Sequence, residues 1–218
     1  MIADTHVKVL IVDDHRMFVE GLVAALDREP DIDVVGTASL VGESVERATA
    51  TRPDVVILDH LLPDGDGIEA TDLIKHEVPD VSIVIVTQLD DDGVAARALE
   101  HGCSGFLTKD KPLDEVVDAI RAAASGGAVI APGMLARLLE RYRTPGASNE
   151  ALSVRELDVL RLLGEGFDND AIARRLAVTL STVRNHIQSI IEKLHVHSKL
   201  EAVITALREG LITPPSRT

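Results

Sequence analysis

The chain of 218 residues has very few aromatic residues and a single cysteine, Cys103: it contains no tryptophan, one tyrosine and three phenylalanines. Its cores must therefore be built mostly from aliphatic side chains. One cysteine excludes an internal disulfide framework and fits a reducing compartment. No apolar run approaches the roughly 20 residues that a membrane-spanning helix needs, and the amino-terminal segment lacks the pattern of a signal peptide. We therefore expect a cytoplasmic protein with no membrane partner.

Positive charge is scarce as well, and the deficit is uneven along the chain. The formal net charge is −14, and residues 1–147 hold 27 of the 36 acidic residues but only 13 of the 22 basic ones. Residues 148–218 hold nine of each sign. An acidic surface repels the phosphates of nucleic acids. Only the second part of the chain is therefore a candidate for DNA binding. Because its net charge is zero, its basic residues would have to be grouped on one surface to attract DNA.

Strand and helix patterns alternate through the first 125 residues. Short β-branched apolar runs, typical of strands buried on both faces of a parallel sheet, occur at residues 7–13, 32–38, 54–59, 81–87 and 105–108. Helical spacing of apolar residues occurs at residues 15–28, 41–50, 66–77, 92–101 and 112–124. Five such alternations predict an α/β domain with a doubly wound, five-stranded parallel sheet.

Chemically reactive side chains follow the expected strands. Asp13 and Asp14 end the first run, Asp59 the third, Thr87 the fourth, and Lys109 closes the fifth. The carboxyl ends of parallel strands share one edge, where ligands bind. Three clustered carboxylates repel one another unless a cation lies among them, and oxygen ligands of this kind suit Mg²⁺. The pattern indicates a magnesium site and phosphoryl transfer to an aspartate.

The strand pattern stops after residue 125. Residues 126–150 combine a helical apolar stripe at Met134 to Leu139 with a turn-rich segment, so we expect a linker helix and a hinge at 144–150. From residue 151 onward the pattern predicts only helices, with Ser153 and Glu156 forming a capping box. Two short helices joined by a tight turn, at about 169–176 and 180–194, are typical of a helix-turn-helix. The expected divisions are 1–125, 126–150 and 151–218.

The segment 180–194 resolves into two faces at about 100° per residue. Val183, Ile187, Ile190 and Leu194 share a narrow arc and should be buried. The opposite side carries Arg184, Asn185 and Gln188, a cation and two amides, the groups that reach base edges in a major groove. Taken alone, this face favours an ordinary solvated surface over a DNA-binding one.

Residues 7–124 resemble the receiver domain of two-component response regulators. The resemblance rests on Asp13-Asp14, the segment DHLLPDGDG that contains Asp59, Thr87, and the segment from Phe106 to Lys109. It implies that a partner histidine kinase phosphorylates Asp59 and that Asp13, Asp14 and Asp59 hold Mg²⁺. It also implies that Lys109 pairs with the phosphoryl group, while Thr87 grips a phosphoryl oxygen and Phe106 changes rotamer with it.

Residues 152–203 closely resemble the four-helix, LuxR-type DNA-binding domain of the NarL/FixJ family. The resemblance implies binding to double-stranded DNA as a homodimer, with contacts from the last helix; the candidates there are Ala202, Val203 and Ala206. It implies that Arg184, Asn185 and Gln188 face bases. It implies that Thr182, His186 and Lys193 lie near phosphates.

The leading hypothesis is therefore a DNA-binding transcriptional response regulator, not an enzyme, that is controlled by phosphorylation. An aspartyl-phosphate phosphatase would need a second acid two residues after Asp59, where this chain has Leu61. A ligand-sensing LuxR-type protein would carry an aromatic-lined first domain, which the composition opposes. A receiver controlled by a ligand or a partner instead of phosphate stays open, because Gln88 stands where the family generally has a small residue.

Overall fold

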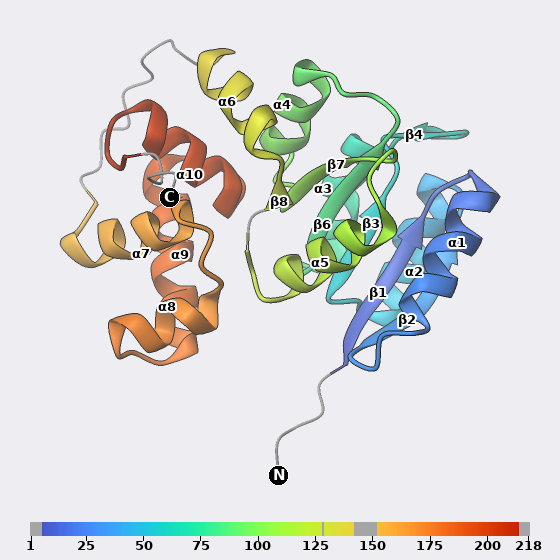
Figure 1. Cartoon of the computed structure of the whole chain (residues 1–218), viewed down its shortest axis with the longest axis horizontal. Coiled ribbons are helices and arrows are strands. Elements are labelled where there is room, and N and C mark those ends of the chain that lie inside the picture. The colour runs from blue at the N-terminus through green and yellow to red at the C-terminus, as the bar shows by residue number, and fades with distance from the viewer. Residues whose placement is uncertain (1–5, 128, 142–151, 214–218) are drawn as a thin grey trace.

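The computed structural model describes residues 6–127, 129–141 and 152–213. They form an α/β half and an all-helical half, which lie side by side in Figure 1. The hinge expected at 144–150 lies outside the described residues. None of the helices in the described ranges has the length and apolar character required to cross a membrane.

The α/β half is built on a parallel sheet whose strand order is β2-β1-β3-β6-β7-β8. The five strands expected from the sequence are present, and Val129–Ile130 adds a short sixth strand beside β7. The central strands are apolar on both faces, since helices cover the sheet on either side. The strands are β1 (Val7–Val12), β2 (Ile32–Ala38), β3 (Val55–Leu58), β6 (Ser82–Thr87), β7 (Gly105–Thr108) and β8 (Val129–Ile130).

Helices pack on both faces of this sheet, as Figure 1 shows. One aliphatic core joins the sheet to α1 and α5, and the other joins it to α2, α3 and α4. The expected doubly wound arrangement is confirmed. The helices are α1 (Arg16–Leu26), α2 (Val41–Thr51), α3 (Gly67–Glu77), α4 (Asp92–Glu100) and α5 (Leu113–Ala124).

One feature between the expected elements was not predicted. A two-stranded antiparallel hairpin, β4 (Leu61–Leu62) with β5 (Gly65–Asp66), follows the phosphoacceptor candidate Asp59. After α5, the linker helix expected from the apolar stripe is present as α6 (Pro132–Arg141). Its Met134 and Leu138 are buried in the core on the α4 side of the sheet.

The second half consists of α7 (Val154–Gly164), α8 (Asn169–Leu176), α9 (Leu180–Leu194) and α10 (Lys199–Arg208). Side-chain oxygens cap the amino end of every one of these helices, and Ser153 and Glu156 form the expected capping box on α7. Such caps satisfy backbone N–H groups that the helix itself leaves unpaired. The four-helix domain with a helix-turn-helix at α8 and α9 is confirmed.

Helix α10 packs against α4 and α6, so it connects the two halves. Leu200 and Ile204 are buried in the same apolar cluster as Met134 and Leu138 of the linker helix. Polar contacts add to this interface, because the backbone N–H of Asn169 donates to the carbonyl of Ser125 at 3.2 Å. The helical half is therefore docked on the α4 side of the α/β half through its last helix.

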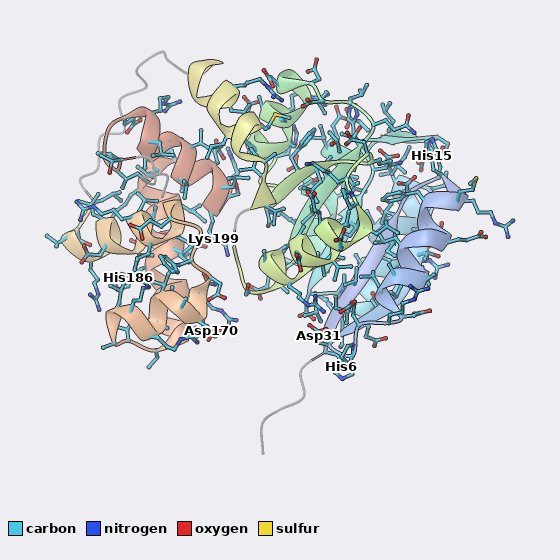
Figure 2. All side chains as sticks on the ribbon, in the orientation of Figure 1. His6, His15, Asp31, Asp170, His186 and Lys199 are labelled. Carbon is cyan, nitrogen blue, oxygen red and sulfur yellow. The ribbon has the colours of Figure 1, made fainter. Side chains whose placement is uncertain are left out.

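A half-buried lysine lies at the same boundary. Lys199 donates from Nζ to the carbonyl oxygen of Gly126, and Figure 2 shows it between the two halves. Burial, and then the nearby Arg184 charge, lower the pKa of Lys199 to about 8. Burying an ammonium group costs free energy that one carbonyl offsets only in part, so the interface contains an element that favours its opening.

One expectation about α10 is wrong. Ala202, Val203 and Ala206 were candidates for contact with a second copy, but they are 1%, 4% and 0% exposed. They pack into the core that α10 shares with α7 and α9. The other apolar side of α10, with Leu200 and Ile204, faces the receiver.

Candidate functional site

The reactive side chains expected at the strand ends lie at the carboxyl edge of the sheet. Asp13 follows β1, Asp59 follows β3, Thr87 ends β6 and Lys109 follows β7. These four strands are neighbours in the sheet, so their last residues meet at one rim. The backbone N–H of Asp59 donates to the carbonyl of Val12, which fixes the two acidic strand ends side by side.

Lys109 joins the two buried acids. Its Nζ lies 2.6 Å from Oδ2 of Asp13 and 2.6 Å from Oδ2 of Asp59. The three side chains are only 7%, 1% and 5% exposed, respectively, and the Phe18 ring centroid lies 5.1 Å from the ammonium nitrogen. Burial raises the pKa of Asp59, although the hydrogen bond from Lys109 opposes the rise. One ammonium thus holds two carboxylates together in a mostly dry pocket.

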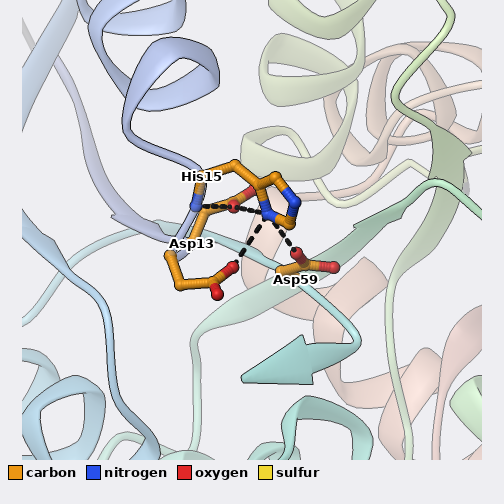
Figure 3. Close-up of side chains that lie close together, drawn as sticks. Asp13, His15 and Asp59 are labelled. Carbon is orange, nitrogen blue, oxygen red and sulfur yellow. Dashed lines mark hydrogen bonds and ion pairs between the residues drawn. The ribbon is translucent and has the colours of Figure 1, made fainter. Parts of the chain in front are cut away.

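His15 is a fifth member of the cluster, and sequence reasoning missed it. Its Nδ1 lies 2.8 Å from Asp14, 3.2 Å from Asp13 and 3.7 Å from Asp59, each measured to a carboxylate oxygen. Figure 3 shows the imidazole between Asp13 and Asp59. One ligand atom from each of these four residues fits within 4.8 Å of the others. The oxygen donors of the three acids fit a divalent cation such as Mg²⁺.

Thr87 and Phe106 are buried next to this edge. Thr87 is 1% exposed, and its Oγ1 accepts a hydrogen bond from the backbone N–H of Leu89 at 3.3 Å. Phe106 is 3% exposed and pairs in register with Ile85, two residues before Thr87. Gln88, in contrast, is exposed. The hydroxyl is held at the end of β6, and the aromatic ring belongs to the core beneath it.

Gly67 is a second residue whose importance the sequence did not reveal. A Cβ at this position would lie 1.9 Å from the carbonyl oxygen of Asp59. The N–H of Gly67 also donates to the carbonyl of His60 at 2.8 Å. The first turn of α3 therefore fits against the Asp59 backbone only without a side chain. His60 itself is buried and is not a member of the acidic cluster.

In the helical half, α9 presents the two faces that its sequence predicts. Val183, Ile187, Ile190 and Leu194 are buried. Arg184, Asn185 and Gln188 are exposed to solvent. The helix begins at a Thr179 cap, whose Oγ1 accepts from the N–H of Thr182 at 3.2 Å.

The expected phosphate-contacting residues are not equivalent. Thr182 and His186 are half-buried near the start of α9. Lys193 instead lies inside its own domain, with Nζ 2.9 and 2.8 Å from the two carboxylate oxygens of Glu156. Burial alone would raise the pKa of Glu156, but hydrogen bonds from Lys193, Ser189 and Ser153 outweigh it and lower the pKa to about 2.

Glu156→Gln should destabilise the helical domain by about 3 kcal/mol at pH 7, because it leaves Lys193 without its buried partner. The folded pKa of Glu156 lies below the unfolded value of about 4.5. Its contribution is therefore complete above pH 4.5 and is lost as pH falls towards 2. Urea unfolding at pH 7 and pH 3 should show the wild-type advantage shrinking with acid. The exposed Glu165→Gln is the matched control; an equal loss there would contradict the assignment.

Comparison with known proteins agrees with both halves of this geometry. Residues 9–121 match the family model of the response regulator receiver domain, and residues 150–206 match that of the LuxR family of bacterial regulatory proteins. The response regulator protein VraR of Staphylococcus aureus is 34% identical over 206 residues, which cover 94% of this chain and 99% of the relative. The chain belongs to the LuxR-family response regulators.

Solved structures of response regulators share the architecture. A LuxR-family two-component response regulator from Aurantimonas sp. SI85-9A1 is 33% identical with a TM-score of 0.59, over 62% of this chain and 97% of that one. A structure of two RcsB dimers bound to two parallel DNAs is 25% identical with a TM-score of 0.56, over 93% and 98%. This LuxR-family regulator therefore combines a receiver domain with a LuxR-type DNA-binding domain, the architecture of a transcriptional regulator.

Proposed function

We propose that the chain is a transcriptional response regulator switched by phosphorylation of Asp59, with a sensor histidine kinase as phosphodonor, and that it binds double-stranded DNA as a homodimer. The observation that carries the proposal is the Lys109 ammonium, held at 2.6 Å from both Asp13 and Asp59 at the carboxyl edge of the sheet. A regulator without phosphoryl chemistry has no evident need to bury two acids and a lysine together.

The chemistry follows from these groups. An oxygen of the Asp59 carboxylate attacks the phosphorus of the donor, and the bond from phosphorus to the donor atom breaks, with its electron pair leaving on the donor. Asp59 becomes an acyl phosphate. Asp13, Asp14 and Asp59 would hold Mg²⁺, which supplies charge neutralisation at the phosphoryl oxygens. Lys109 is already in place to pair with the added negative charge.

The remaining residues of the edge respond to that charge. The Thr87 hydroxyl donates to a phosphoryl oxygen once one is present and gives up its present contact with the Leu89 backbone. This movement changes the space at the end of β6, and Phe106 repacks in the core beneath. Helix α4 follows β6 directly and contacts α10. The site is thereby connected to the interface with the DNA-binding half.

We assign residues 1–125 to the receiver, 126–150 to the linker helix and hinge, and 151–218 to the DNA-binding domain; the family matches at 9–121 and 150–206 support this division. Arg184, Asn185 and Gln188 read base edges from the exposed face of α9. Thr182 and His186 contact phosphates. Lys193 contributes there only if it leaves Glu156, so the DNA interface does not depend on it.

The proposal is tested by selecting DNA sites from a random library with the full chain and measuring binding with and without a small acyl phosphate and Mg²⁺. We expect phosphorylation to shift the chain from monomer to dimer in gel filtration and to tighten DNA binding at least tenfold. Unchanged mass and affinity after stoichiometric phosphorylation would contradict the proposal and favour control by another ligand.

Arg184→Ala should weaken specific DNA binding by about 1–3 kcal/mol, or roughly 5- to 150-fold, because a bidentate contact to a base is lost. Arg184 is exposed, so its replacement leaves the fold intact. The control is Arg161→Ala on α7, which removes the same charge from a side chain that is 54% exposed. Fluorescence anisotropy at several salt concentrations measures both variants, and equal losses would show that Arg184 acts only through its charge.

A further inference from the structure

The acidic cluster at the sheet edge includes a nitrogen donor. His15 follows the Asp13-Asp14 pair directly and turns its Nδ1 towards the carboxylates, at 2.8, 3.2 and 3.7 Å from Asp14, Asp13 and Asp59 (Figure 3). The same nitrogen lies 3.4 Å from Nζ of Lys109. The imidazole therefore shares the space that a cation bound by the three acids would occupy.

Neither helix capping nor core packing holds the His15 ring, which is oriented by its contacts with the carboxylates of Asp14 and Asp13. His15 is the N-cap residue of α1, but its side chain makes no capping hydrogen bond. The backbone N–H of His15 donates to Oδ1 of Asp13 at 2.8 Å, and any residue at this position could supply that contact. The side chain is 50% exposed, so core packing does not fix the ring either. The contacts of the ring nitrogen lie within the cluster.

A nitrogen donor changes which ions a site prefers. Mg²⁺ is a hard cation that binds oxygen ligands and retains its waters. First-row transition ions accept imidazole readily, and their affinity for a mixed nitrogen and oxygen site rises from Mn²⁺ through Co²⁺ to Ni²⁺. Three carboxylates alone distinguish these ions less sharply than three carboxylates with an imidazole.

We propose that His15 is a metal ligand in this chain, and that the phosphoacceptor site binds divalent transition ions through Nδ1 in addition to carboxylate oxygens. The inference rests on the proposed function only in that the cation site is the one beside Asp59. Mg²⁺ uses the carboxylates and leaves the imidazole aside, whereas Mn²⁺, Co²⁺ and Ni²⁺ use both. The site would then respond to which metal ion the cell supplies.

Direct binding measurements on the full, unphosphorylated chain test this. We expect isothermal titration calorimetry to give tighter binding of Ni²⁺ and Co²⁺ than of Mg²⁺. His15→Ala should weaken Ni²⁺ and Co²⁺ binding by roughly tenfold or more, as the loss of one imidazole ligand implies, and Mg²⁺ binding by less than about threefold. His76→Ala, an 85% exposed histidine on α3, is the control and should change neither ion.

A spectroscopic signature makes the assignment independent of affinity. With Mn²⁺ bound, electron spin-echo modulation should show coupling to a ¹⁴N nucleus in the wild type and none in His15→Ala. Mn²⁺ binding that depends on Asp13 but shows no ¹⁴N coupling would overturn the role of His15 and leave the phosphoacceptor proposal intact. If Asp13→Asn removes no divalent-ion binding, the cation site itself is wrong, and with it the proposed phosphorylation.

Discussion

Asp59→Asn should abolish phosphorylation of the chain by a small acyl phosphate and Mg²⁺. The wild type should gain one phosphoryl group per chain, and the product should be labile to base and to hydroxylamine, as an acyl phosphate is. An asparagine amide is a poor nucleophile and loses the negative charge that pairs with Lys109. The side chain keeps its size, so the buried pocket stays filled and the receiver stays folded. Intact-protein mass spectrometry gives the stoichiometry directly.

The matched control for this experiment is Asp80→Asn. Asp80 is exposed and precedes β6, at the opposite edge of the sheet from the acidic cluster. This variant should accept phosphate as the wild type does. Labelling of the Asp59→Asn chain at the wild-type level, or labelling that persists after Mg²⁺ is chelated, would place the phosphoacceptor elsewhere.

The effect on signalling should follow from the same variant. If phosphate on Asp59 supplies the free energy that shifts the regulator towards its DNA-binding form, Asp59→Asn should keep the basal DNA affinity and lose the response to the phosphodonor. A ligand can move an equilibrium only by its differential affinity for the two states, and here the covalent phosphate has that role. A basal affinity equal to that of the phosphorylated wild type would mean that the amide itself mimics activation.

The sequence predicted the acidic edge because strand order and burial follow from simple patterns. β-branched runs ending in Asp13, Asp59 and Thr87 predict parallel strands, and parallel strands place their ends together. The same reasoning could not find His15, because its role depends on the rotamer that brings Nδ1 to the carboxylates. Gly67 was missed for a related reason: the close approach of α3 to the Asp59 backbone is a tertiary contact.

The helical half shows the same division between local and tertiary information. The 3.6-residue period separated the buried Val183 face of α9 from the exposed Arg184 face, and the structure agrees. Periodicity could not say what covers each side of α10, since both sides are apolar. One side, with Val203, completes the DNA-binding domain, and the other, with Ile204, meets the receiver. The sequence also predicts Lys193 to be a surface cation, whereas the structure pairs it with Glu156.

The docking of α10 suggests how the receiver restrains the DNA-binding half. Arg184 remains exposed while Leu200 and Ile204 are covered by α4 and α6. The receiver therefore does not bury the Arg184 side chain in this closed arrangement. What the receiver covers is the apolar side of α10, which a second copy could otherwise use. Phosphorylation would then act by biasing the arrangement towards one in which α10 is released.

A disulfide across this interface should lock the closed arrangement. An ideal Cβ at Gly126 would lie 3.0 Å from Cγ of Asn169, and a cysteine at 169 would place its sulfur where that Cγ stands, within reach of a sulfur on residue 126. The native Cys103 does not compete, because it is 1% exposed and burial raises its pKa to about 11. Position 126 has a φ of +79°, so Gly126→Cys carries strain of about 1–2 kcal/mol. The oxidised and reduced forms of the variant both carry this strain, so it does not affect the comparison between them.

The oxidised Gly126→Cys/Asn169→Cys chain should still accept phosphate on Asp59. The bridge joins the turn after α5 to the first residue of α8, and α5 starts at the carboxyl edge of the sheet and runs away from it. It should nevertheless fail to dimerise and should bind DNA at least tenfold more weakly than the same phosphorylated chain after reduction. The single variants Gly126→Cys and Asn169→Cys should show no dependence on reductant. If the bridged, phosphorylated chain dimerises and binds DNA as the reduced chain does, release of α10 is not the step that phosphorylation controls. Helix α10 would then serve only to join the two halves.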